Sequence, residues 1–156
     1  CAAFELQFDV SVRHNYKYKE QEKVKKKIIK IIENSRETEF SDSEKIYFDE
    51  IIEGMKNAKE TLKKRIDIVL QEFIEIYGEQ NIKCDFEEDY VKMPERIKNS
   101  RNALDHGNVE YKFERNMYWD AELLRAMVYM LILKTAGVSD KNKLFNTLKK
   151  LSKYPI

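Results

Sequence analysis

Hydrophobic residues recur every three to four positions along most of the chain, with polar residues between them. This is the period of an amphipathic α-helix, and the pattern predicts no strands. The expected helices cover residues 2–12, 19–34, 41–77, 90–106, 117–136 and about 140–152. The segment 117–136 is apolar over most of its circumference, so we expect it to be the buried central helix. The pattern therefore predicts one all-α domain over residues 1–156, an up-and-down bundle of five to six helices.

A few capping residues set the expected helix boundaries. Ser41-Asp-Ser-Glu44 has the spacing of a capping box and opens the longest predicted helix. Gly78 is expected to end that helix, because glycine readily takes the conformation found just beyond a helix. Pro94 fits only the first turn of a helix, so the regular helix there is expected to begin near Met93. Residues 78–89 are polar and acidic and are expected to form a loop.

Two helices have apolar positions that are expected to face the core. In the lysine-rich helix of residues 19–34 the spacing predicts an apolar stripe formed by Val24, Ile28, Ile31 and Ile32. In the helix of residues 90–106 the expected core contacts are Val91, Ile97 and Leu104. These positions leave the lysines of the first helix, and the polar residues at the end of the second, on solvated faces.

The chain is rich in charge but nearly neutral. Lysine and arginine number 29 against 28 aspartate and glutamate residues, so the net charge of +1 gives no overall signal for a polyanionic partner. The segment 17–30 is locally basic, with seven lysines against two glutamates. Two interpretations stay open for it: a solvated helix face, which is the more common case, or a surface that binds RNA. The lysines of the second interpretation are Lys23, Lys26, Lys27 and Lys30.

Signals of several other protein classes are missing from the sequence. Two cysteines do not make a disulfide framework, and reduced thiols in the cytoplasm are the expectation. No signal peptide is visible, and the longest apolar run, residues 126–133, is far shorter than a membrane span. No metal-site spacing of Cys and His and no glycine-rich phosphate loop occurs, so we expect neither a metal nor a cofactor. Because the chain begins with Cys1 rather than Met, we expect it to be a piece of a longer chain or a processed product.

One helix end concentrates residues suited to phosphate chemistry, in the string Arg101-Asn-Ala-Leu-Asp-His106. Asn102 and His106 are four apart and share a helix face. Arg101 and Asp105 have the same spacing and can pair. Gly107 is expected to end the helix, which leaves His106 in the last turn, where the helix dipole favours the imidazolium. A histidine beside an arginine can act on a phosphodiester, whereas a helix cap beside a surface ion pair is the alternative.

Residues 100–107, Ser-Arg-Asn-Ala-Leu-Asp-His-Gly, resemble the motif of the Apea-like branch of the HEPN superfamily, in which Arg-Asn precedes His-Gly at a helix end. The opening residues Ala3-Phe4-Glu5-Leu-Gln-Phe8 are similar to the start of such domains, and the apolar helix of residues 117–136 is expected after the motif. The resemblance implies a HEPN-like helical bundle and metal-independent RNA cleavage by attack of a ribose 2′-hydroxyl on the adjacent phosphate. It also implies a homodimer with facing motifs, and a role as a toxin or in antiviral defence. Such domains often form the C-terminal part of a longer protein, so the resemblance also implies a further domain before this one.

By position, the resemblance makes Arg101 and His106 the catalytic pair and Asn102 their polar support. Asp105 is either a further support or only the partner of Arg101. Arg101 and His106 are five apart, which separates them by about 140° around an ideal helix. They converge only if the helix end is distorted, if the arginine reaches round, or if a second copy completes the site. A non-catalytic module that dimerises or binds a nucleotide, RNA or a partner is the alternative, and a plain helical scaffold is a third.

Overall fold

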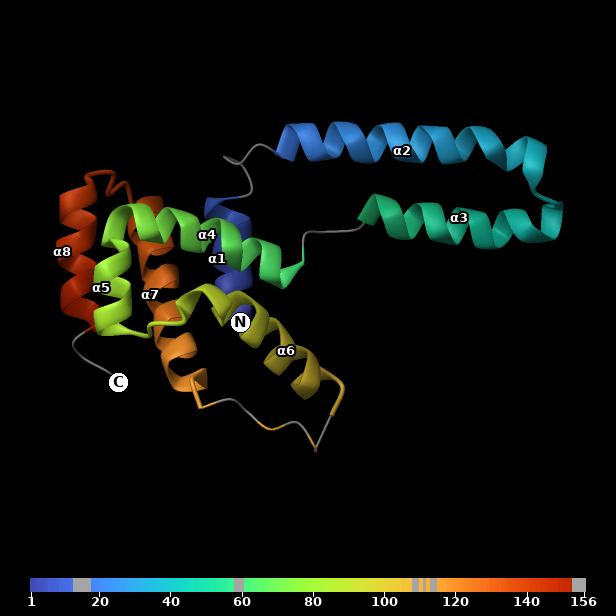
Figure 1. The fold of residues 1–156 in the computed structure, drawn as a ribbon. Helices are drawn as coiled ribbons and strands as arrows, with labels where there is room; N and C mark the ends of the chain where they lie inside the picture. Colours follow the sequence, from blue (N-terminus) through green and yellow to red (C-terminus); the bar gives the residue numbers. More distant parts are fainter. Residues whose placement is uncertain (13–17, 58–60, 108–109, 111, 113–114, 153–156) are drawn as a thin grey trace. The chain divides into compact units, whose positions relative to one another are not determined.

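The computed structural model describes all residues except 13–17, 58–60, 108–109, 111, 113–114 and 153–156. The described residues form eight α-helices and one short 3-10 helix and contain no strand (Figure 1), which confirms the predicted all-α fold. The elements are α1 (Ala2–Ser11), α2 (Tyr18–Glu39), α3 (Asp42–Asn57), α4 (Leu62–Tyr77), α5 (Glu79–Asp85), η1 (Tyr90–Lys92), α6 (Met93–Asp105), α7 (Met117–Thr135) and α8 (Lys141–Ser152).

The helices divide into two compact units. The bundle consists of Cys1–His14 and Thr61–Ile156, and the hairpin consists of Asn15–Glu60. Each unit has buried apolar residues of its own. None of the described helices is both long and apolar enough to cross a membrane.

The core of the bundle is built around α7. This helix packs against α1, α4, α6 and α8, which confirms the prediction that the segment 117–136 is central. Its outer face is less buried than its composition suggests, because Trp119 and Ile132 are exposed. The inward face is lined with long apolar side chains that close-pack against the neighbouring helices. These residues are Leu123, Leu124, Met127, Met130 and Leu131.

The first part of the predicted loop over residues 78–89 is wrong, because residues 79–85 form the helix α5, whereas residues 86–89 are not helical. Gly78 ends α4 with a φ of 82°, as expected, but the chain then turns directly into α5. The sequence signal for a helix in this stretch is weak, because acidic residues dominate its composition. Only the pair Ile82 and Phe86, four apart and both buried, has helical spacing. The Tyr77 hydroxyl donates to the Asp85 carboxylate at 2.6 Å and ties the end of α5 to α4.

The single long helix predicted over residues 41–77 is wrong, because the structure has two helices there. Thr61 caps the second one: its side chain accepts a hydrogen bond from the Lys64 N–H at 3.3 Å. Threonine prefers this position over a helix interior, since its hydroxyl satisfies a backbone donor at the helix start. The apolar spacing continues across the break, so periodicity alone could not locate it. The intervening residues 58–60 lie outside the described residues.

The hairpin packs α2 against α3 around a small apolar cluster. Helix α2 extends past residue 34, where it was expected to end, to Glu39. Among the α2 residues whose burial is described, Ile29 is buried, whereas Val24, Ile28 and Ile31 of the predicted stripe are exposed. Helix α2 has apolar residues on two adjacent faces, one with Val24, Ile28 and Ile31 and one with Ile29 and Ile32. The second face packs against α3. The cluster contains Ile29, Phe48 and Ile52, with Ile32, Phe40 and Met55 partly buried against it.

The predicted capping box at the start of α3 is confirmed for one of its two bonds, the one from the Ser41 N–H to the Glu44 carboxylate. The Glu44 N–H donates instead to the Ser41 carbonyl at 3.0 Å. The Glu44 carboxylate accepts hydrogen bonds from the Ser41 hydroxyl at 2.6 Å and from the Ser41 N–H at 2.9 Å. The hydroxyl bond, followed by the backbone bond, holds the pKa of Glu44 below its usual value. A carboxyl with a lowered pKa adds stability above its unfolded pKa, about 4.3, and this contribution disappears as the pH falls through the folded pKa.

We therefore expect Glu44→Gln to lower the melting temperature of the hairpin at pH 7, and the difference from the wild type to shrink as the pH falls below about 4. Thermal melts followed by circular dichroism at the two pH values measure this. Glu50→Gln, at an exposed position of the same helix outside the box, is the matched control. A Glu44→Gln deficit that is as large in acid as at pH 7 would refute the ionic cap.

Candidate active site

Helix α6 carries the Arg101–His106 cluster and is positioned by its buried face. Pro94 lies in the first turn and the regular helix begins at Met93, as predicted. Ile97 is buried as expected, but Val91 and Leu104 are 67% and 62% exposed, so these two predicted core contacts are wrong. The buried face runs instead along a helical stripe that leaves Leu104 outside it. Its members are Met93, Ile97, Ser100 and Ala103.

The end of α6 is closed by the two residues that follow Asp105. His106 has φ −93° and ψ 6°, and its N–H donates to the Asn102 carbonyl at 3.0 Å. Gly107 has a φ of +61°, which favours glycine, and its N–H donates to the Leu104 carbonyl at 3.1 Å. The predicted helix stop at Gly107 is confirmed. His106 is therefore the first residue outside the regular helix, and its side chain is exposed.

Arg101 lies between two carboxylates. Its side chain is 40% exposed, with Nε 3.5 Å from Asp105 Oδ2 and one terminal nitrogen 3.8 Å from Glu5 Oε2. The predicted Arg101–Asp105 pair is thus confirmed. Both separations exceed the 2.7–2.9 Å typical of a short charge-assisted hydrogen bond, and the longer one exceeds it by about a full ångström. The guanidinium therefore makes no short hydrogen bond to either carboxylate, and its N–H groups can donate to the oxygens of a phosphate instead.

Glu5 of α1 belongs to this cluster and was not identified from the sequence. Its other carboxylate oxygen lies 3.9 Å from Arg65 of α4, so Glu5 bridges two arginines. Arg65 is buried, and its guanidinium lies over the Phe8 ring at 5.6 Å. The sequence signal was a glutamate between two core phenylalanines on α1, in the opening stretch 3–8 that resembles the start of HEPN domains. It could not show which arginine would lie opposite, because that contact depends on the tertiary fold.

A buried ion pair fixes α6 to α7. Arg96 and Asp120 are 6% and 3% exposed, and their two hydrogen bonds measure 2.7 and 2.5 Å. The bonds to Asp120 raise the pKa of Arg96. The Arg96 guanidinium also donates to the Asp89 carbonyl at 3.2 Å, and a Glu87 carboxylate oxygen lies 3.9 Å away. This network sets the position of α6, and therefore of the cluster at its end.

The structure brings only part of the predicted site together. Arg101 and Asp105 are in contact, while Asn102 and His106 are exposed at the same helix end. Among the described residues, no ion pair or hydrogen bond joins the His106 ring to another side chain. In the same part of the chain, no group of three or more His, Cys, Asp or Glu residues is arranged to hold a metal ion.

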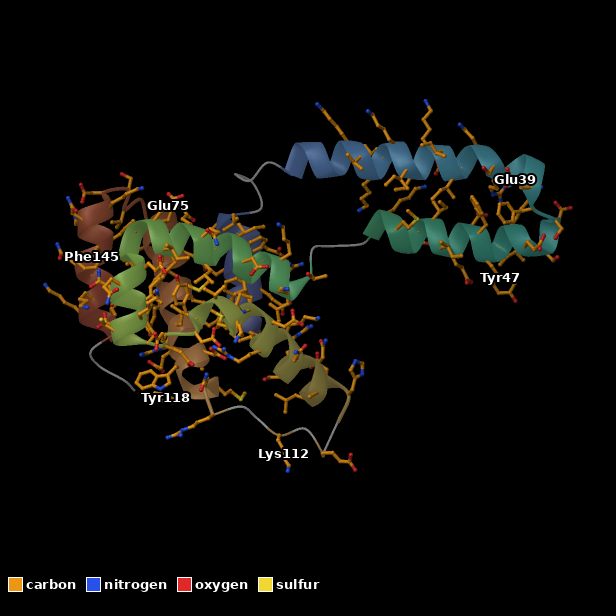
Figure 2. All side chains as sticks on the ribbon, in the orientation of Figure 1. Glu39, Tyr47, Glu75, Lys112, Tyr118 and Phe145 are labelled. Carbon is orange, nitrogen blue, oxygen red and sulfur yellow. The ribbon has the colours of Figure 1, made fainter. Side chains whose placement is uncertain are left out.

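The four lysines assigned to RNA binding, Lys23, Lys26, Lys27 and Lys30, are exposed on α2 and belong to the hairpin. Figure 2 shows side chains lining both helices of this unit, with Tyr47 of α3 directed away from α2. The assignment of these lysines to RNA stays a prediction.

An all-helical bundle with an arginine and a histidine at one helix end is the arrangement that the resemblance to HEPN domains implies. Comparison with known families agrees: the model of the family described as Apea-like HEPN matches residues 8–142, which include helices of both units. The chain belongs to the Apea-like HEPN family. No curated protein and no solved structure matches it. HEPN domains are often ribonucleases or nucleotide-binding modules, and they commonly dimerise.

Proposed function

We propose that the chain is a metal-independent endoribonuclease domain that cleaves single-stranded RNA. The ribose 2′-hydroxyl attacks the adjacent phosphate and leaves a cyclic phosphate end. The observation that supports this most is the accessibility of Arg101 and His106 at one helix end, in a family whose members are often ribonucleases. A toxin or antiviral defence role in the cytoplasm, with the whole chain acting as one domain, is part of the proposal.

Each residue has a chemical task in this reaction. Arg101 presents a planar set of donors to the phosphoryl oxygens, where charge grows in the transition state. His106 transfers protons to or from the reacting oxygens, and its exposed position lets RNA reach it. Asn102 supports the pair by orienting the imidazole or contacting the phosphate. Asp105 holds Arg101 until the phosphate replaces it.

We also propose that the active form is a homodimer with the two α6 ends facing each other. Removal of the 2′-hydroxyl proton and protonation of the leaving 5′-oxygen need a base and an acid together. One His106 cannot supply both in a single step, whereas two copies related by a twofold axis supply one each. The lysines at positions 23, 26, 27 and 30 would attract the RNA electrostatically.

The test uses RNA whose cleavage depends on the proposed nucleophile. We expect the protein to cut single-stranded RNA equally fast in EDTA and in magnesium. We expect a single 2′-deoxynucleotide at the cleaved position to stop cleavage there, because the attacking oxygen is missing. Gel analysis of end-labelled RNA measures both. Cleavage that requires magnesium, or that continues at the 2′-deoxy position, would contradict the mechanism.

A non-catalytic RNA- or nucleotide-binding module is the second candidate. The observation that favours it is that, among the described residues, no ion pair or hydrogen bond to a side chain orients the exposed His106 ring, whereas Arg101 can still contact a phosphate. Binding of RNA without any product in the same assay would select this candidate.

A further inference from the structure

A groove lies beside the Arg101 cluster, within the bundle. It is bounded by the start of α1, by α6 and by α7, and it has a volume of about 330 Å³. Its floor is formed by Ile97, Leu124 and Ser100, which are all buried. Exposed Leu104 and Ala121 form its walls. The groove is therefore a concave apolar site that is open to solvent.

Charged groups of the motif border this apolar groove. Arg101 and Asp105 both contribute to its lining, and they are the residues that form the ion pair at the end of α6. Asp120 lies in the lining too, with both carboxylate oxygens bonded to Arg96. A ligand that fills the groove thus meets an apolar surface along most of its length and a guanidinium at one edge.

The size and chemistry of the groove fit a nucleoside. Small-molecule sites have volumes of about 300–1,000 Å³, so this groove suits one ring system with its sugar. A protein partner needs about 800 Å² of surface from about 20–30 residues on each side, whereas ten of the described residues line this groove. Binding in an apolar groove is favourable for the flat faces of a base, because it removes them from water. A phosphate instead needs a cation such as Arg101.

We propose that the groove between α6 and α7 is a nucleobase subsite: it binds the base of a nucleotide while Arg101 binds the phosphate of that nucleotide. The subsite rests on the proposed function, because in RNA it holds the base next to the phosphate that is cut. The base contacts Leu104, Ala121 and the apolar floor. The groove thereby aligns the chain of the RNA with the motif, and it makes cleavage depend on which base occupies it.

The test measures binding of ligands that contain no bond to cut. The four nucleoside 5′-monophosphates are compared with ribose 5-phosphate, which has the same phosphate and sugar but no base. The chain has five methionines, and Met117 lines the groove whereas Met127 and Met130 are fully buried elsewhere in the core. Titrations of methyl-labelled protein followed by NMR therefore report the site through Met117, with the buried methyl groups as internal references.

We expect at least one nucleoside monophosphate to shift Met117 and to bind at least about tenfold more tightly than ribose 5-phosphate. Ala121→Phe fills the groove from an exposed position and should abolish this preference. The matched control, Ala136→Phe, places the same side chain at the exposed end of α7 outside the lining and should keep it. Arg101→Ala should weaken both classes of ligand by a similar factor.

The outcomes separate this subsite from the ribonuclease proposal. Equal affinity for the two ligand classes, an unmoved Met117, or an Ala121→Phe variant with unchanged preference would each overturn the subsite, whatever the RNA assay gives. Selective nucleotide binding by a protein that does not cut RNA would retain the subsite and reject the ribonuclease. Circular dichroism confirms that each variant is folded, and Leu104→Ala, which trims an exposed wall, is a second variant expected to weaken the preference.

Discussion

Replacing Arg101 or His106 by alanine is expected to lower RNA cleavage by at least about 100-fold, while helical content stays at the wild-type level. The first change removes the donors that stabilise the charged phosphorus centre, and the second removes the group that transfers protons. Both side chains are accessible to solvent, so truncation opens no cavity in the core. Initial rates of cleavage, with circular dichroism of the same samples, measure the effect.

Two further variants control for charge and position. Arg115→Ala removes an exposed arginine outside the motif and should cleave at the wild-type rate. Arg101→Lys keeps the charge but loses the planar fork of donors, so an intermediate rate is expected. Wild-type cleavage by both Arg101→Ala and His106→Ala would show that the end of α6 is not the active site.

Mixing the two inactive variants tests how the proposed dimer shares its residues. The proposed site needs the histidines of both chains, so a mixed dimer, which has only one His106, is expected to stay inactive. If a site needed only the arginine of one chain and the histidine of the other, each mixed dimer would contain one intact site. Random reassociation makes about half of the dimers mixed, so a return of about a quarter of the wild-type activity would contradict the two-histidine site.

Asp120→Ala is expected to lower the free energy of unfolding of the bundle by about 3–5 kcal/mol. The change leaves the Arg96 guanidinium buried without its main partner, and arginine cannot relieve the cost by losing its proton. The carbonyl of Asp89 and the carboxylate of Glu87 offset this cost only in part, since neither makes the two short hydrogen bonds that Asp120 makes to Arg96. Urea unfolding followed by circular dichroism measures the difference.

The chain contains a matched exposed pair for this experiment. Arg36 and Asp49 in the hairpin also form two hydrogen bonds, of 2.9 and 2.7 Å, but their side chains are much more exposed, at 32% and 57%. Asp49→Ala should therefore have little effect on unfolding. A double replacement of Arg96 and Asp120 by leucine should recover most of the lost stability, because neither charge is then stranded. Equal effects of Asp120→Ala and Asp49→Ala would refute the importance of burial.

Local signals predicted much of the helical framework. The capping box at Ser41, Gly78 at the end of α4 and Gly107 at the end of α6 each involve residues close in the chain. The apolar circumference of α7 likewise identified the central helix before any contact was known. Each of these features depends on residues within one helix, so the residue types alone are enough to predict it.

Features that depend on contacts between helices could not be predicted. The choice of Ile29 over Ile28 as the buried residue of α2 is made by α3. The Arg96–Asp120 pair joins residues 24 positions apart, and Glu5 contacts Arg101 from 96 positions away in the chain. The break before Thr61 was hidden because apolar residues keep helical spacing on both sides of it. Tertiary packing decides these points.

For the candidate site, the sequence supplied the residues and the structure supplied their surroundings. The pairing of Arg101 with Asp105 was predicted from their spacing, whereas the contact with Glu5 and the groove beside it were not. Catalysis by Arg101 and His106 follows from the motif and stays a prediction. The surroundings make it testable, because they show which variants leave the fold intact.

The most direct test of the central claim is the chemistry of the RNA end that the purified protein forms in EDTA. Mass spectrometry of the cleaved fragments should find a 2′,3′-cyclic phosphate with the wild-type chain, and His106→Ala purified in the same way should form at least about 100-fold less. A product ending in a 3′-hydroxyl, or equal amounts of cyclic phosphate from both proteins, would contradict the account.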